Sequence, residues 1–357
     1  MTRHPESYFP ADYRVGRRAF IAACEAAGTD AIARVHPGAR GPDGKPLFID
    51  SAALGPRDAK KALLLIAGTH GVEGYFGSAV LTGLLREGVK PPQGARLVLV
   101  HALNPYGFAW NRRVNEDNVD LNRNFVDHKH PPANPDYVEL AGAVAIADAS
   151  PEAIARADAA LDAYAAKHGP AAFQAAFSRG QYQFPKGLFF GGSALSWSHR
   201  MLRAILTEDL AKVEKLVVID CHTGLGPPGN AEMIVEDLPG SPGHARAKNM
   251  WGSLVASADA GESLSAPVTG SLDQALAAWL PKVELTYGVL EVGTVPVTQL
   301  LEVLRRDNWL HNFAPDQGLA PEITSATRAA FYLDRADWKT RVFGHAMEAV
   351  QSALAAL

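Results

Sequence analysis

The stretch KALLLIAGTHGVEG, residues 61–74, decides how the rest of the chain is interpreted. Its first half is a short apolar run, typical of a strand that is covered on both faces. The run ends in a glycine-rich turn that carries His70 and Glu73. Because imidazole and carboxylate groups are zinc ligands, the turn raises the question of whether the chain supplies the rest of a metal site.

Composition narrows the class of protein. The chain has 357 residues, of which 47% are hydrophobic and 20% are charged, and its net charge is −4. That length is sufficient for one large α/β domain or two ordinary ones. The absence of a basic run argues against a nucleic-acid partner. Because the sequence contains neither a signal-peptide core nor an apolar run long enough for a membrane span, we expect a cytoplasmic protein with no membrane association.

Further apolar runs predict a parallel or mixed sheet, and helical patterns lie between them. The predicted strands lie near 62–68, 95–103, 215–224 and 287–294. The predicted helices cover 75–88, 198–212 and 335–357. This alternation predicts an α/β fold with three layers, in which helices cover both faces of the sheet.

One region differs from this alternation. Residues 145–178 are rich in alanine and predict two helices that break near Gly169. We interpret about 128–197 as a helical insertion or crossover within a single catalytic domain that spans 1–357. A small lid is the alternative interpretation of the alanine-rich segment.

A second histidine strengthens the metal hypothesis. His222 follows another apolar run, in VVIDCHTGLG, and this run also ends in a glycine loop. In open α/β sheets, sites form outside the carboxyl ends of the strands. His70 and His222 both occupy such ends, so we expect them to share a site. Taken alone, each histidine is also compatible with a simple hydrogen bond to the backbone.

Glu291, in LEVGT, lies inside an apolar run. A buried glutamate requires either a basic partner or a chemical role. The partner is the ordinary interpretation. The role of a general base beside an activated water becomes the better one if the histidines converge nearby.

The polar segment NRRVNEDNVDLNRNF, residues 111–125, supplies candidate substrate contacts. Arginine binds carboxylates with a planar fork, so Arg123 with Asn122 could hold a substrate carboxylate. Arg112 or Arg113 could polarise a scissile carbonyl. A solvated loop is the alternative interpretation of so polar a run.

Taken in order, His70-x-x-Glu73, Asn122-Arg123, His222 and Glu291 resemble the zinc carboxypeptidase superfamily. The resemblance is closest to the branch of succinylglutamate desuccinylase and aspartoacylase-like proteins, and to a bacterial group with the GTHGVEG signature. It spans roughly residues 60–300. It implies an α/β/α sandwich around a mixed, mostly parallel sheet.

The resemblance also implies a role for each matched residue. These roles are one zinc ion held by His70, Glu73 and His222; Glu291 as general base and acid; Arg113, or alternatively Arg112, polarising the carbonyl; Asn122 and Arg123 binding a substrate carboxylate; and Asp120 supporting His70. The implied reaction is hydrolysis of an amide bond next to a carboxylate, in a peptide C-terminus or a small N-acyl amino acid.

Several alternatives stay open. Tyr106, Tyr182 and Tyr287 are all candidates for an assisting tyrosine. A metal-free binding module on the same scaffold would not need Glu291 as a base. A serine-type α/β hydrolase would need a Gly-x-Ser-x-Gly elbow, which GGSAL at 191–195 does not provide.

Overall fold

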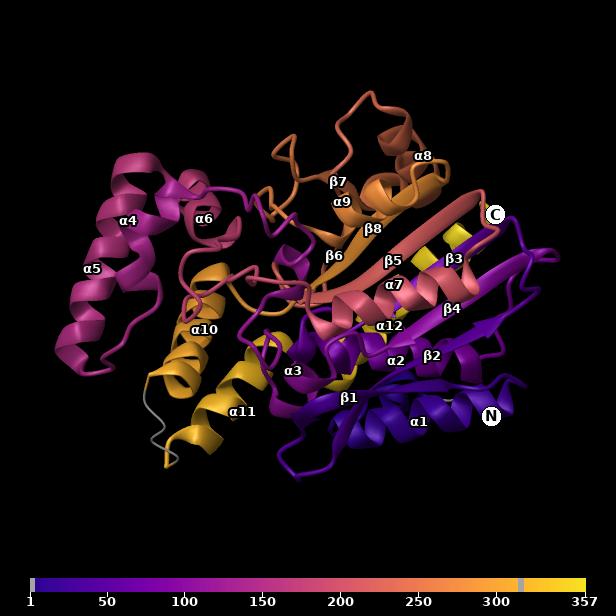
Figure 1. The fold of residues 1–357 in the computed structure, drawn as a ribbon, viewed down its shortest axis with the longest axis horizontal. Helices are drawn as coiled ribbons and strands as arrows, with labels where there is room; N and C mark the ends of the chain where they lie inside the picture. The colour runs from indigo at the N-terminus through magenta and orange to yellow at the C-terminus, as the bar shows by residue number, and fades with distance from the viewer. Residues whose placement is uncertain (1–3, 314–317) are drawn as a thin grey trace.

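The computed structural model describes residues 4–313 and 318–357 (Figure 1). Within them, one eight-stranded sheet forms the middle of the molecule, in the order β1-β2-β4-β3-β5-β8-β6-β7. The strands are β1 (Ile32–Arg40), β2 (Pro46–Leu54), β3 (Lys61–Ala67), β4 (Ala95–His101), β5 (Lys215–Gly224), β6 (Ala231–Val235), β7 (Val255–Ser257) and β8 (Glu284–Gly293).

The centre of the sheet is parallel and its flanks are mixed. β4, β3, β5 and β8 run parallel to one another, whereas β2 is antiparallel to β4 and β6 is antiparallel to β8. The carboxyl ends of the central strands therefore meet at one edge of the sheet, where the register places His222 opposite Glu291. The predicted mixed, mostly parallel sheet is confirmed.

Helices cover both faces of this sheet. One face carries α1 (Tyr13–Ala26), α2 (Gly74–Arg86), α8 (Pro242–Trp251) and α12 (Ala336–Ala355), and the other carries α7 (Trp197–Asp209) and α9 (Leu272–Trp279). Alternate side chains of β3 enter the two cores: Leu63 and Leu65 pack in the first, and Leu64 and Ile66 in the second. This alternation produces the three layers that were predicted.

A third group of helices lies beside the carboxyl ends of the strands. It contains α4 (Pro135–Val144), α5 (Pro151–His168), α6 (Pro170–Ser178), α10 (Val297–Asn312) and α11 (Ala320–Phe331). Figure 1 shows α4, α5 and α6 together on the left, next to α10. Their apolar residues share a core that includes Phe177, Leu301 and Phe331. As predicted, α5 and α6 are separated at Gly169, whose φ is 86°.

The remaining helical pieces are short. They are α3 (Pro105–Trp110) and four 3₁₀ helices at Pro5–Tyr8, Gly71–Glu73, Leu121–Arg123 and Gly252–Leu254. The longest helix, α12, has 20 residues. Among the described residues, no helix combines the length and the apolar composition that crossing a bilayer requires.

Candidate metal centre and its cavity

The turn after β3 brings His70 and Glu73 to one point. Gly68 has a φ of 67°, and a Cβ at Gly71 would lie 2.1 Å from the carbonyl carbon of Gly107. These two positions therefore require glycine if the turn is to fold this tightly against its neighbour. In the resulting geometry, His70 Nδ1 lies 2.9 Å from Glu73 Oε1.

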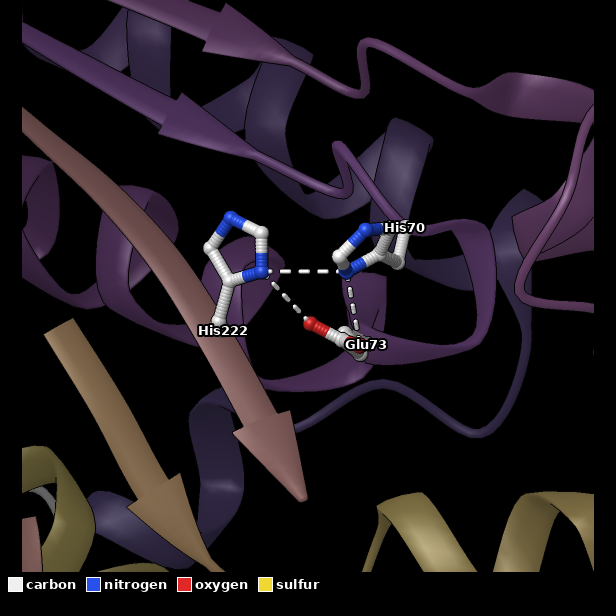
Figure 2. A group of neighbouring side chains, drawn as sticks. All are labelled: His70, Glu73 and His222. Atoms are coloured by element: carbon white, nitrogen blue, oxygen red, sulfur yellow. Dashed lines mark hydrogen bonds and ion pairs between the residues drawn. The ribbon is translucent and has the colours of Figure 1, made fainter. Parts of the chain in front are cut away.

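His222, near the end of β5, completes the group (Figure 2). Its Nδ1 lies 3.0 Å from Nδ1 of His70 and 3.0 Å from Glu73 Oε2. All three side chains are buried, and one ligand atom from each lies within 4.8 Å of the others. Figure 2 shows the three side chains converging from the turn and from the strand.

This donor set suits a zinc ion. Two imidazole nitrogens that face each other at 3.0 Å repel if both present lone pairs, and a cation between them removes that repulsion. Two histidines and one carboxylate are the ligands of a catalytic zinc site, which leaves a fourth position open. The buried carboxylate of Glu73 also supplies negative charge to offset that of the cation. Burial raises the pKa of Glu73, but the two adjacent imidazoles outweigh burial and hold it below its ordinary value.

A carboxylate lies behind each imidazole. His70 Nε2 is 3.1 Å from Asp120 Oδ1, and His222 Nε2 is 2.9 Å from Asp220 Oδ2. Burial lowers the pKa of His222, but the carboxylates of Asp220 and Glu73 outweigh burial and raise it well above its usual value. Each ring therefore turns Nε2 toward its own carboxylate and Nδ1 toward the other two side chains, which is the arrangement in which a carboxylate orients a metal-binding imidazole.

The sequence interpretation missed Asp220. The residue is fully buried within β5 and accepts hydrogen bonds from Thr69 Oγ1, at 2.8 Å, and from the Tyr287 hydroxyl, at 3.1 Å. An aspartate inside the apolar run VVIDCH was the available signal, because such a residue requires a partner. Tyr287 thereby holds a defined place beside the site.

Arg113 packs against the same group. Its Nε donates to Asp120 Oδ2 at 3.0 Å, and its Nη1 donates to Glu73 Oε1 at 3.2 Å. Nη2 lies 2.8 Å from His70 Nε2. The bonds to the two carboxylates hold the Arg113 guanidinium in place. Burial raises the pKa of Asp120, but Arg113, His70 and Arg123 together outweigh burial and hold it well below its usual range.

Glu291 reaches the site from β8, the strand beside β5. It pairs in register with His222, and its Oε1 accepts a hydrogen bond from the backbone N–H of Leu225 at 2.8 Å. Burial, and then the negative charge of Glu73, raise the pKa of Glu291 to about 8. Among the described residues, no basic side chain lies within 4 Å of the Glu291 carboxylate.

Arg123 and Asn122 line the same cavity from the 3₁₀ helix Leu121–Arg123. The Arg123 guanidinium is buried and donates to the backbone carbonyls of Ser178, at 2.7 and 3.0 Å, and of Asn122, at 2.8 Å. Within the described part of the chain it makes no ion pair at 4 Å or less. Asn122 Oδ1 accepts from the backbone N–H of Leu272, which fixes the start of α9.

Arg112 is not brought to this group. Its guanidinium is buried and pairs with Asp307 of α10, with Nε 3.0 Å from Oδ2, and it does not line the cavity. This position does not support Arg112 as a substrate contact or a carbonyl-polarising residue. The neighbouring Arg113 lines the cavity instead.

The cavity over these residues has a volume of about 130 Å³. Its wall joins the turn after β3, the ends of β5, β6 and β8, and helices α6, α10 and α11. The apolar part of the lining includes Phe177, Phe189, Leu225, Ile234, Val289, Leu300, Leu301, Leu304 and Phe331. Tyr287 is part of the lining, whereas Tyr182 donates its hydroxyl to the carbonyl of Arg123 and Tyr106 lies outside the lining.

Solved structures with a similar fold include the following three. They are bovine thrombin-activatable fibrinolysis inhibitor (12% identity, TM-score 0.48, 96% of this chain and 99% of that chain covered), carboxypeptidase A from Helicoverpa armigera (13%, 0.47, 97% and 74%), and an aspartoacylase family protein from Mesorhizobium loti (15%, 0.39, 80% and 67%). Because the identities and TM-scores are this low, the similarity assigns no chemical role to any side chain of this chain.

Sequence comparison gives a family and no closer relative. No curated protein matches the chain. One family profile matches residues 9–345, which is nearly the whole sequence. The chain therefore belongs to the family described as Protein of unknown function (DUF2817).

Proposed function

We propose that this protein is a zinc-dependent hydrolase that cleaves an amide bond next to a carboxylate. The convergence of His70, Glu73 and His222 on one buried point, with Nδ1 of both imidazoles facing inward, carries this proposal. Zinc bound there would lower the pKa of a water molecule to about 7 and polarise a carbonyl group.

The residues around that point suit proton transfer and charge stabilisation. Glu291 is held by the Leu225 N–H and has its pKa raised to about 8, so it can accept and return a proton near neutral pH. The positive charge of a bound metal would lower this pKa. Arg113, with its guanidinium at the edge of the cavity, can stabilise negative charge on the carbonyl oxygen.

Arg123 supports a substrate that bears a carboxylate. A buried guanidinium without a carboxylate partner is costly, and a substrate anion in the cavity would supply that partner. Arg113 and Arg123 would thus hold the scissile carbonyl and the carboxylate of one molecule. Helices α6 and α10 line the cavity above the site, which favours a small N-acyl amino acid over a long peptide.

Metal analysis of the purified protein, followed by an activity screen, tests the proposal. We expect about one zinc per chain, hydrolysis of at least one N-acyl amino acid, and loss of activity with a chelator that added zinc restores. Dipeptides in the same screen report on carboxypeptidase activity. Activity that is indifferent to chelators would favour a serine-type hydrolase, and ligand binding without turnover would favour a binding module.

A further inference from the structure

Phe189 has a backbone conformation that is unusual for its residue type. Its φ of 53° falls in the left-handed region, which a bulky L-residue rarely adopts. A glycine would adopt this conformation without steric cost, and the neighbouring positions 187, 191 and 192 are glycines. Strain of this kind persists only where the surrounding structure enforces it, and it clusters at functional sites, so the contacts of the ring are informative.

The surrounding hydrogen bonds hold this conformation in place. The Gln181 N–H donates to the carbonyl of Phe189 at 3.1 Å, and the Asp120 N–H donates to the carbonyl of Phe190 at 2.8 Å. Asn124 Nδ2 donates to the carbonyl of Gly191 at 2.9 Å. Because Asp120 also contacts His70 and Arg113, the segment is connected directly to the candidate metal centre.

The ring of Phe189 lies close to both guanidinium groups of the cavity. The distance from its centroid to Cζ is 5.3 Å for Arg113 and 5.6 Å for Arg123. Both distances are within cation–π range, and the attraction is stronger where water is excluded, as it is at this buried ring. Phe177 of α6 supports the ring, with 5.9 Å between the two centroids.

Phe189 also borders two spaces. A small void of about 10 Å³ lies beside the cavity and is lined in part by Arg112 and Asp307. Arg113, Phe189 and Leu304 line both the void and the cavity. Without the ring, the Arg113 guanidinium would gain room on the side of the Asp307 carboxylate, away from the cavity.

Within the hydrolase function proposed above, we infer that Phe189 is a positioning residue, whose ring directs Arg113 at the scissile carbonyl and Arg123 at the carboxylate of the same substrate. A residue in this position affects both substrate binding and turnover, because the two arginines act on different parts of the molecule. It also sets the spacing between these two parts, and so selects substrates whose carboxylate lies close to the scissile bond.

The test compares the adjacent phenylalanines 189 and 190. Phe190 is buried in the same segment, but it does not line the cavity. The variants are Phe189→Leu, Phe189→Tyr and the matched control Phe190→Leu. Three measurements are made on each: the melting temperature, kcat and KM on an N-acyl amino acid that the wild type hydrolyses, and the Kd of succinate, a dicarboxylate probe, by calorimetry on the zinc-loaded protein.

We expect Phe189→Leu to raise KM, to lower kcat/KM at least tenfold and to weaken succinate binding, whereas Phe189→Tyr retains wild-type values within about threefold. Phe190→Leu should lower the melting temperature by a similar amount and leave both affinities unchanged. Equal losses in Phe189→Leu and Phe190→Leu, or wild-type kinetics and succinate affinity in Phe189→Leu, would overturn the inference. If the wild type hydrolyses nothing, the proposed function fails, and the succinate affinities still decide the role of Phe189. A wild type that binds no succinate would also overturn the inference about Phe189.

Discussion

Arg112 and Arg113 are consecutive in the chain, yet their guanidinium groups pair with different carboxylates. Arg112 Nε lies 3.0 Å from Asp307 Oδ2 of α10, and Arg113 Nε lies 3.0 Å from Asp120 Oδ2 beside the candidate metal centre. Arg112 therefore ties the loop after α3 to α10, while Arg113 lines the cavity. Substitutions at these two positions should have separable consequences.

For Arg112, we expect a loss of stability. Its pair with Asp307 is buried on both sides, and removal of one partner leaves a buried charge uncompensated, which costs about 3–5 kcal/mol. Arg112→Ala should lower the free energy of unfolding in urea by about that amount, with kcat unchanged per folded molecule. The double variant Arg112→Met/Asp307→Leu should recover much of the loss. A fall in kcat without a fall in stability would contradict this assignment.

For Arg113, we expect a loss of catalysis. Removal of one donor to a developing oxyanion typically costs about 3–4 kcal/mol of barrier, or two to three powers of ten in rate. Arg113→Ala should therefore lower kcat by roughly that factor on a substrate that the wild type hydrolyses. Arg113→Lys keeps the charge without the fork and should recover only part of the rate. If Arg113→Ala turned over at nearly the wild-type rate, the carbonyl-polarising role would be misassigned.

Asp220→Asn should weaken zinc binding. The Asp220 carboxylate lies 2.9 Å from His222 Nε2, and loss of such a supporting carboxylate typically lowers metal affinity by about 10–100-fold. A competition titration against a chromogenic chelator measures this change. Asp127→Asn is a suitable control, because Asp127 is exposed and pairs with His130 on the surface. Equal zinc affinity in the wild type and Asp220→Asn would exclude a supporting role.

We expect the buried His101 to make the protein less stable in acid. Its ring is buried, stacks on Phe20 with 4.9 Å between centroids, and lies 2.8 Å from Ser78 Oγ through Nε2. Burial lowers the pKa of His101 to about 3. Between its unfolded pKa of about 6.5 and this value, the unfolded chain binds a proton that the folded chain does not, so stability falls as pH falls, by up to ~1.4 kcal/mol per pH unit.

Urea unfolding at several pH values between 7 and 4 measures that slope. His101→Gln removes this titrating group and should reduce the slope over the same range, even if the variant is less stable overall. The prediction fails if the wild type and His101→Gln lose stability in parallel.

The four central parallel strands, β3, β4, β5 and β8, were predictable because each is a short, nearly continuous apolar run. The strands on either side of them were not. At the two edges of the sheet, β1 is largely exposed, with the pattern IARVHPGAR, and β7 has only three residues. Such segments become strands because a neighbour offers unpaired backbone groups, which depends on tertiary structure. The predicted helices at 75–88 and 198–212 were correct to within three residues, as α2 and α7 show.

The candidate site was predictable where strand ends determined it. His70 and His222 follow apolar runs, so the parallel sheet brings them together without further information. Asp220 was missed because its partner is defined only in the fold. The choice between Arg112 and Arg113 was also beyond the sequence, because the turn that contains them has no regular periodicity from which the direction of each side chain follows.

The register between β5 and β8 places His222 directly beside Glu291. Backbone hydrogen bonds between these strands therefore fix the separation of Glu291 from the candidate metal centre at one strand spacing of about 4.8 Å. Insertions in the surrounding loops leave this separation unchanged, whereas a slip of one residue in the register of β8 would turn the Glu291 carboxylate to the opposite face of the sheet. The helices above the cavity can consequently diverge in sequence and change which molecule fits, while the candidate metal centre keeps its dimensions.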